Sequence, residues 1–399
     1  MREVEALKPT FERVQRQALI VGGVALALSV IGLFFDTPQF FRSYLVAYLY
    51  WISLPLGSFA LLMLHHLVGG GWGFAIRRMM EAATRTFLPM ALLFLPIVLG
   101  LAHLYEWTHA DVVAKDEVLR HKSSYLNVPF FLARAAIYFI VWIGWSYLLN
   151  KWSFEQDRTH DPSLTRRIQD MSGPGLLLFG ATVTFASVDW VMSLEPHWYS
   201  TIYGIIFMIG QGLTTLAFMI LLLSRLWRRP PLVGVVEVQQ FHDLGNLLLT
   251  FVMLWAYVAF SQFLIIWSAN LPEEIPWYLR RTQGGWKAVA GALILFHFVV
   301  PFFLLLLRVT KRVAPRIALL SLAMLFMRWV DLFWMVTPAF SHGEAVGLHV
   351  HWLDVTTFVG LGGLWLGLFF WQLKERPLLP LYDPRLEESL HGAKVLHHG

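Results

Sequence analysis

Residues 44–68 read YLVAYLYWISLPLGSFALLMLHHLV, a run without a single Asp, Glu, Lys or Arg. A helix of this length crosses the roughly 30 Å hydrocarbon core of a bilayer, and the run lacks the period-two alternation of a barrel strand. Nine further apolar runs lie at 18–35, 86–106, 128–149, 174–192, 201–226, 244–268, 285–308, 314–336 and 350–373. The sequence therefore predicts an all-α integral membrane protein with about ten transmembrane helices.

The composition of the 399-residue chain agrees with this class of protein. Hydrophobic residues make up 57% of the chain and charged residues only 14%, whereas soluble domains carry roughly a quarter charged residues. We expect a tail at 1–17, a transmembrane domain at 18–373 and a second tail at 374–399, with no separate soluble domain.

The distribution of Lys and Arg predicts the orientation in the membrane. Of these 31 residues, 22 fall in the tails and in loops on their side, seven fall in the opposite loops, and Arg134 and Arg328 lie within spans. Cytoplasmic loops carry the excess of positive charge. Both termini are therefore expected in the cytoplasm. The basic pI is a topology signal and does not indicate nucleic-acid binding.

The chain contains no cysteine. This excludes disulfides, thiolate-held iron–sulfur clusters and covalent c-type haem within the chain. A b-type haem needs two His at matched depth, and His103, His297 and the pair His65 and His66 do not supply them. Any redox centre of this chain would therefore be a His-ligated haem or a diffusible molecule such as a quinone, and otherwise electrons would run in partner subunits. No metal ligand set is expected.

A faint repeat relates the two halves of the chain. Val188-Asp189 is followed by Pro196, and Val330-Asp331 is followed by Pro338 at the same distance. The repeat predicts two parallel four-helix bundles, about 44–193 and 201–337, related by an axis along the membrane normal. The first and last spans would flank them.

Ionisable residues at membrane depth are costly, and they mark candidate functional sites. Most of them fall towards the outer side of the predicted spans, namely Asp189, Glu195, His197, Arg328, Asp331, His103 and Glu106. Towards the inner side lie His65, His66 and Asp243, and His297 lies at mid-depth. These residues are candidates for a proton path or a quinol site.

Each candidate also has a structural interpretation. Arg328 and Asp331 stand one turn apart and can neutralise each other as an ion pair. Asp189 has no partner on its own helix, so it must pair across helices or meet water. His103 and Glu106 can be solvated interfacial residues, and His297 can be a hydrogen-bonded core histidine.

Two further stretches carry structural expectations. Segment 69–85 mixes apolar residues with Arg77, Arg78 and Arg85 and is expected to be an interfacial amphipathic connector. Gly360, Gly363 and Gly367 form a small-residue stripe suited to close packing against the first span or another subunit.

Three stretches carry a resemblance to a known family. FASVDWVMSLEPHWYSTIYG (185–204), HHLVGGGWGFAIRRMMEA (65–82) and HDLGNLLLTFVMLWAYVAFSQFLIIWSANLPEEIPWYLRR (242–281) resemble the ActF-type membrane subunit of bacterial alternative complex III. That subunit belongs with the NrfD-like membrane subunits of polysulfide-reductase-type complexes. The resemblance covers nearly the whole chain and implies the same two-bundle architecture.

The resemblance also implies a function. Such a complex oxidises quinol, for instance menaquinol, at the outer side and passes electrons to a cytochrome c or another high-potential acceptor. The implied partners are a paralogous NrfD-like subunit, an iron–sulfur subunit, multihaem and monohaem cytochrome c subunits and small membrane subunits, with haem c and the iron–sulfur clusters held by those partners.

We therefore expect a subunit without a redox centre, acting as scaffold and proton path. One alternative is a quinol site of its own near His103, Glu106 and Asp189. A second alternative is an independent secondary transporter.

Overall fold

The computed structural model describes residues 7–341, 347–380 and 382–384. The ends of both predicted tails, and the residues His342 and Glu344, lie outside these ranges. Within them the chain is helical, without strands, and ten of its helical segments are long and apolar enough to cross a membrane. The predicted class, an all-α membrane protein with ten spans, is confirmed at this level.

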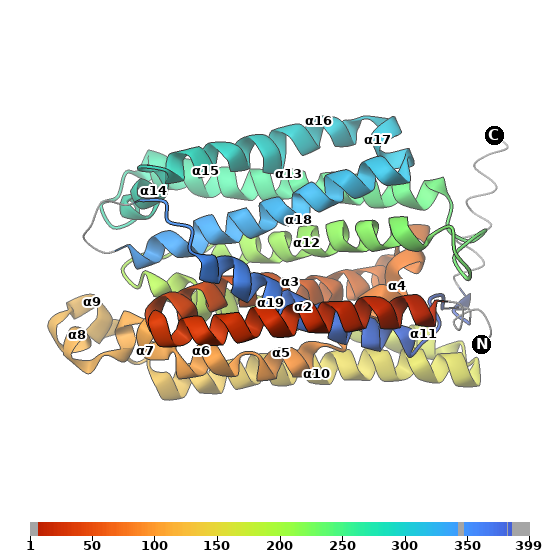
Figure 1. The fold of residues 1–399 in the computed structure, drawn as a ribbon, viewed down its shortest axis with the longest axis horizontal. Helices are drawn as coiled ribbons and strands as arrows, with labels where there is room; N and C mark the ends of the chain where they lie inside the picture. Colours follow the sequence, from red (N-terminus) through yellow and green to blue (C-terminus); the bar gives the residue numbers. More distant parts are fainter. Residues whose placement is uncertain (1–6, 342–346, 381, 385–399) are drawn as a thin grey trace.

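Eight of the ten spans are single long helices running along the length of the molecule (Figure 1). They are α2 Lys8–Phe35, α3 Thr37–Val68, α10 Val128–Thr159, α11 Ser163–Trp190, α12 Tyr203–Leu226, α13 Val238–Ala269, α18 Ala314–Val336 and α19 Trp352–Lys374. Helix α2 begins inside the predicted N-terminal tail, because its polar first turns extend the helix beyond the apolar run.

The third and eighth spans are built from shorter helical pieces. The third runs through α4 Gly71–Thr84, α5 Phe87–Leu92 and α6 Leu95–Leu99. The eighth runs through α15 Trp286–Ala292, a π-helical turn Leu293–Val299 and α16 Val300–Leu306. In the third span, Pro89 and Pro96 lack the backbone N–H that a continuous helix requires, and the chain forms short helices around them.

The expectation for segment 69–85 is wrong. Helix α4 lies inside the protein, with Arg77, Arg78 and Glu81 all buried. Its charges are satisfied by each other and by neighbouring helices instead of by water. The third span therefore begins at Gly71, well before the predicted start at residue 86.

Short helices cap one end of the molecule, opposite the start of α2 and the end of α19. These are α7 Leu101–Leu104, η1 Glu106–Thr108, α8 Ala110–Lys115, α9 Glu117–Lys122, η2 Met192–Leu194, α14 Ile275–Thr282 and η4 Thr337–Phe340. The start of α2 and the end of α19 lie at the other end, where α17 Arg308–Arg312 precedes α18 (Figure 1). We call the two ends the loop end and the terminal end.

Helix α12 lies at the centre of the helix packing. It contacts α3, α11, α13 and α18, and close approach is possible because a Cβ on Gly57 of α3 would lie 2.2 Å from the Gln211 carbonyl oxygen of α12. Helix α19 packs against α3 and, most extensively, against α2.

The contact between α2 and α19 depends on glycine, as the small-residue stripe predicts. A Cβ on Gly22 would lie 2.7 Å from the Cα of Gly363, and one on Gly363 would lie 2.4 Å from the Ala18 carbonyl oxygen. The expected packing of the stripe against the first span is therefore confirmed.

Candidate functional site

A stripe of buried polar side chains follows one face of α10. Its members recur every three or four residues, which places them on a single helix face; they are Arg134, Tyr138, Trp142, Ser146, Asn150, Ser153 and Gln156, and all are buried. At 1.5 Å per residue the stripe is about 33 Å long. The α10 stripe is therefore about as long as the hydrocarbon core of a bilayer is thick.

Asp189 of α11 meets the α10 stripe towards the loop end. The Arg134 guanidinium donates to both carboxylate oxygens, with Nε 2.8 Å from Oδ2 and Nη2 2.9 Å from Oδ1. The Tyr138 hydroxyl donates to Oδ2 at 2.6 Å. Asp189 is thus paired across helices, as its lack of a partner on α11 requires. A bidentate arginine and a phenol together hold the carboxylate in a fixed position.

Aromatic rings surround the middle of the α10 stripe. The Trp142 indole N–H donates to the Thr182 hydroxyl at 2.9 Å, and its ring contacts those of Phe87, Phe139 and Trp190. An indole N–H is a donor only and cannot pass a proton on. The layer around Trp142 therefore divides the stripe into two polar segments, one towards each membrane face.

At the terminal end the α10 stripe joins the buried charges of α4. Glu81 accepts hydrogen bonds from Arg77 Nε at 3.0 Å, Arg78 Nη1 at 2.7 Å and the Ser153 hydroxyl at 2.7 Å. Asn150 continues the contact one turn further into the membrane, where its Nδ2 donates to the Thr84 hydroxyl at 3.0 Å.

Carboxylates from two other segments complete this charge network. Arg78 also bonds Asp157 of α10 at 2.5 Å, and Arg77 bonds Asp383, beyond the end of α19, at 2.5 Å. The Tyr382 ring stacks on His160 at 3.7 Å between centroids. The C-terminal segment thereby closes the terminal end of the network. We call Arg77, Arg78, Glu81, Asp157 and Asp383 the α4 network.

A second polar group lies in the other half of the molecule. Arg328 and Asp331 of α18 form an ion pair one turn apart, and both are buried. The Trp255 indole N–H donates to Asp331 Oδ2 at 3.2 Å. The His297 ring stands edge-on to Trp255 at 4.4 Å, and neither of its ring nitrogens has a hydrogen-bond partner among the described residues. His297 is therefore fully buried next to the Asp331 group, on the π-helical turn of the eighth span.

A cavity of about 620 Å³ opens beside Asp331. Its walls are mainly apolar and aromatic, and they come from α12, α13, α14, α15, the π-helical turn and α18. Gln262 and Tyr278 add a polar corner, where Gln262 Nε2 donates to the Tyr278 hydroxyl at 3.2 Å. Burial raises the pKa of Tyr278 to about 12, so its phenol stays protonated at neutral pH.

Glu195 joins two loops at the loop end. Its Oε1 accepts from Arg280 Nη1 at 2.9 Å, and its Oε2 accepts from Arg281 Nη2 at 2.6 Å. Arg281 also donates to the Met335 carbonyl oxygen at 2.7 Å. This carboxylate therefore ties the connection after α11 to α14 and to the end of α18.

His197 lies on the surface at the same end. Its Nε2 is 2.7 Å from Asp116 Oδ2. Asp116 caps the N-terminus of α9 by accepting from the Val118 and Leu119 amides. The Leu119 N–H, followed by the bond to His197, lowers the pKa of Asp116 below its usual range. The His197–Asp116 pair lies on the surface and joins two segments of the loop end.

The remaining predicted residues occupy separate places. His103 stacks on Phe41 at 5.3 Å, and Glu106 lies in η1. His65 and His66 are buried at the terminal end of α3, whereas Asp243 lies in the first turns of α13, where it accepts from Gln239 at 2.8 Å. Within the described residues, no hydrogen bond or ion pair joins Asp189 to Asp331 or to His103.

The candidates do not form a metal centre in the described part of the chain, where no three His, Asp or Glu residues are grouped as ligands. The sequence interpretation missed the α4 network and the α10 stripe. The spacing of polar residues between 134 and 156 was the signal for the stripe. For the network, the pairing of Arg77 and Arg78 with Glu81 within one helix turn was the available clue.

Comparison with models of known protein families gives no match for this chain, and comparison with curated proteins gives none either.

Proposed function

We propose that the chain is a membrane subunit of a quinol:acceptor oxidoreductase of the alternative complex III type, without a redox centre of its own. It would serve as a scaffold and a proton path in the bacterial inner membrane, with both termini in the cytoplasm. The resemblance of residues 185–204 and 242–281 to the ActF-type subunit, the ten apolar helices and the lack of cysteine support this proposal.

We also propose the two-bundle arrangement that the resemblance implies. Its support is the pattern of helix contacts. In the first half, α11 contacts α3 and α10, and α3 and α10 contact the pieces of the third span; in the second half, α13 and α18 contact α12 and the eighth span. Helices α2 and α19 pack on each other and on α3, as flanking helices would.

The observation that carries the proton-path proposal is the α10 stripe. At the terminal end Ser153 donates to Glu81, and towards the loop end Tyr138 donates to Asp189. Between them on the same helix face lie Ser146 and Asn150, and Asn150 donates to the Thr84 hydroxyl and to the backbone carbonyl of Ser146. Hydroxyl and carboxylate groups can accept and release protons, whereas the Trp142 layer cannot. We therefore infer two half-paths, one from each membrane face, that meet at the Trp142 layer.

A substitution at Tyr138 tests this inference. Tyr138→Phe removes the hydroxyl that bonds Asp189 and keeps the ring and the Arg134–Asp189 pair. Tyr147→Phe is the matched control, because Tyr147 lies on the same helix with its side chain 63% exposed. In the purified complex in proteoliposomes, Tyr138→Phe should lower proton release per quinol oxidised, and Tyr147→Phe should leave it unchanged.

Unchanged stoichiometry and turnover in Tyr138→Phe would contradict the outer half-path. Ser153→Ala tests the inner half-path in the same assay, since it removes the hydroxyl between Glu81 and Asn150. Assembly is checked by co-purification of partner subunits and their haem c absorbance. A colourless chain that purifies alone and shows substrate-dependent flux would contradict the whole proposal and favour a transporter.

The 620 Å³ cavity supports a second candidate function, a quinol site of the chain's own. An isoprenoid quinol needs a mainly apolar cavity with a few hydrogen-bonding groups. Gln262, Tyr278 and Asp331 are polar residues of this lining. Phe260 and Ile294, which are 60% and 61% exposed, line its lipid-facing side. This cavity lies in the other half from His103, Glu106 and Asp189.

A photoreactive quinone tests this candidate. Crosslinks should map to lining residues such as Phe263 and Trp277, and Gln262→Leu should weaken them. Gln239→Leu, near the opposite end of α13, is the control. Labelling that ignores Gln262→Leu, or that maps elsewhere on the chain, would contradict a quinol site in this cavity.

A further inference from the structure

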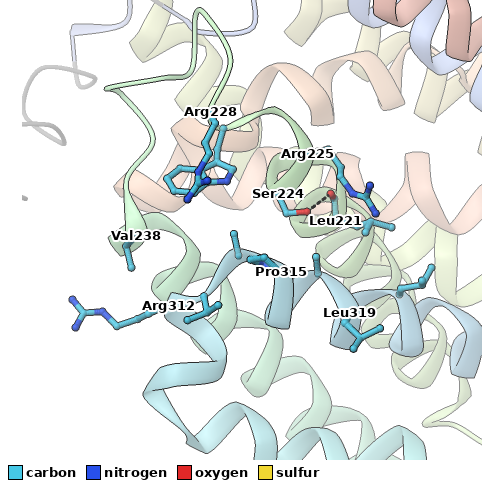
Figure 2. A pocket seen from close by; sticks show the side chains of 13 residues that line it. Leu221, Ser224, Arg225, Arg228, Val238, Arg312, Pro315 and Leu319 are labelled. Atoms are coloured by element: carbon cyan, nitrogen blue, oxygen red, sulfur yellow. Dashed lines mark hydrogen bonds between the residues drawn. The ribbon is translucent and has the colours of Figure 1, made fainter.

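A groove of about 710 Å³ lies at the terminal end, on the side where α12 ends and α18 begins. It is lined by the last turns of α12, including Leu221 and Arg225, by Arg228 just beyond that helix, and by the first half of α18. Figure 2 shows Arg225 and Arg228 on the α12 side and Arg312 near the start of α18. The groove is distinct from the α10 stripe and from the cavity beside Asp331, which share none of its residues.

The groove is strongly positive. Arg225, Arg228 and Arg312 line it, and no Asp or Glu does so. None of the three makes an ion pair with another described residue; Arg228 lies instead over the Trp227 ring, 4.7 Å from its centroid. Helix α18 starts here at Ala314 without a side-chain cap, so the positive end of its dipole faces the same space.

The groove continues into an apolar face of α18. Leu319 and Leu322 line it and are 70% and 52% exposed, and Phe326, 58% exposed, extends this face by one more turn. At 1.5 Å per residue, Phe326 lies about 18 Å along α18 from its first residue, Ala314. Charge at the membrane surface and exposed apolar side chains below it therefore belong to one continuous surface.

We propose that this groove binds an anionic diacyl phospholipid. Its anionic headgroup would lie on the basic rim that Arg225, Arg228 and Arg312 form around the groove, where the side chains of Arg225 and Arg312 point away from each other (Figure 2). One acyl chain would lie along Leu319, Leu322 and Phe326. Basic pockets between transmembrane helices bind such headgroups on the cytoplasmic side of membranes. A soluble anion would use the arginines alone and leave the apolar face without an occupant. The lipid site does not depend on the proposed redox complex or on the proton path.

The site is tested by binding to the purified full-length chain after delipidation. Native mass spectrometry would follow titration with phosphatidylglycerol, with phosphatidylcholine of the same acyl chains, and with inorganic phosphate. Phosphatidylglycerol should bind most tightly. Arg225→Gln/Arg312→Gln should weaken it about 25-fold, since each surface arginine contributes about fivefold, or ~1 kcal/mol.

Control variants separate this site from charge in general. Arg166→Gln/Arg167→Gln removes two exposed arginines of α11 at the same end of the molecule, and phosphatidylglycerol binding should change less than twofold. Leu319→Ser/Leu322→Ser should weaken phosphatidylglycerol without changing the response to inorganic phosphate. All the substituted side chains are exposed, so folding should be retained.

Three results would overturn the proposal. If phosphatidylcholine binds as tightly as phosphatidylglycerol, the arginines do not select an anionic headgroup. If millimolar inorganic phosphate displaces phosphatidylglycerol completely and Leu319→Ser/Leu322→Ser has no effect on its binding, the groove is only an anion site. Equal losses in Arg225→Gln/Arg312→Gln and in Arg166→Gln/Arg167→Gln would show only a general charge effect.

Discussion

At the scale of the residue, three buried carboxylates inside the spans are neutralised by arginine. Asp189 has Arg134, Asp331 has Arg328, and Glu81 has both arginines of α4. A buried ion pair adds little net stability compared with well-packed apolar residues in the same place. Removal of one partner, however, leaves an uncompensated buried charge that costs about 3–5 kcal/mol. This asymmetry decides how variants of these residues should be interpreted.

The Arg134–Asp189 pair gives a prediction about stability. Asp189→Asn alone should destabilise the chain strongly, because Arg134 then keeps a buried positive charge without a counter-charge. Arg134→Met/Asp189→Leu should cost less than the sum of its single variants, with a coupling of about 2 kcal/mol or more. Reversible unfolding in mixed micelles measures all three. Additive costs would show that the pair is not coupled.

The Asp116 cap gives a prediction about pH. Its pKa is lower in the folded chain than in the unfolded chain, so the carboxylate stabilises the start of α9 above the unfolded pKa of about 3.9. That contribution is lost as the pH falls through the lower folded pKa. Hydrogen exchange over 115–122, corrected for intrinsic rates, should therefore rise only below about pH 4.

The control for this prediction is Asp116→Asn. Asparagine is also a good N-cap, so α9 should stay protected while its exchange loses the pH dependence. A pH response that is the same in Asp116→Asn would assign it to another group in the loop.

The partners of these residues show how far the sequence could predict the site. The need of Asp189 for a partner across helices followed from its position in an apolar run. The identity of that partner did not follow, because Arg134 is placed beside it only by the packing of α10 on α11. The pairing of Glu195 with Arg280 and Arg281 was hidden for the same reason, since the carboxylate follows η2 and both arginines belong to α14.

At the scale of the element, hydropathy predicted the spans well wherever one long helix crosses the membrane. It failed for α4, because a segment with Arg77, Arg78 and Glu81 resembles a solvated surface unless its partners are known. Those partners come from α10 and from the C-terminal segment. The α10 stripe is subtler, since Ser, Asn and Gln are each unremarkable in a span, and only their common face gives them meaning.

The contact between α2 and α19 gives a prediction at this scale. Gly22→Ala places a methyl group against the backbone of Gly363 and should separate the two helices. Gly23→Ala is an adjacent control, because a Cβ there has no other atom within 4 Å. We expect Gly22→Ala to cost about 1–3 kcal/mol in unfolding experiments and Gly23→Ala to be neutral or stabilising. Similar costs for the two variants would contradict close backbone packing at Gly22.

At the scale of the whole molecule, the distribution of Lys and Arg predicts that the terminal end faces the cytoplasm. The absence of cysteine makes this testable with single substitutions at exposed sites. Ser124→Cys, at the loop end, should react with a membrane-impermeant maleimide in intact cells. Ser163→Cys, at the start of α11, should react only after permeabilisation. The opposite labelling pattern would show that the terminal end faces outward, and the direction of both half-paths would then be reversed.

The partnership of α2 and α19 has a consequence for biosynthesis. Helix α2 leaves the ribosome before α19, its main neighbour, and eight other spans lie between the two in the sequence. Only 22% of the apolar core of α2 is buried in the finished protein, and α19 supplies most of that cover. Until α19 is synthesised, α2 must therefore remain in contact with lipid or with an insertion factor. A chain released before residue 352 would leave α2 without its main partner and exposed to quality-control proteases.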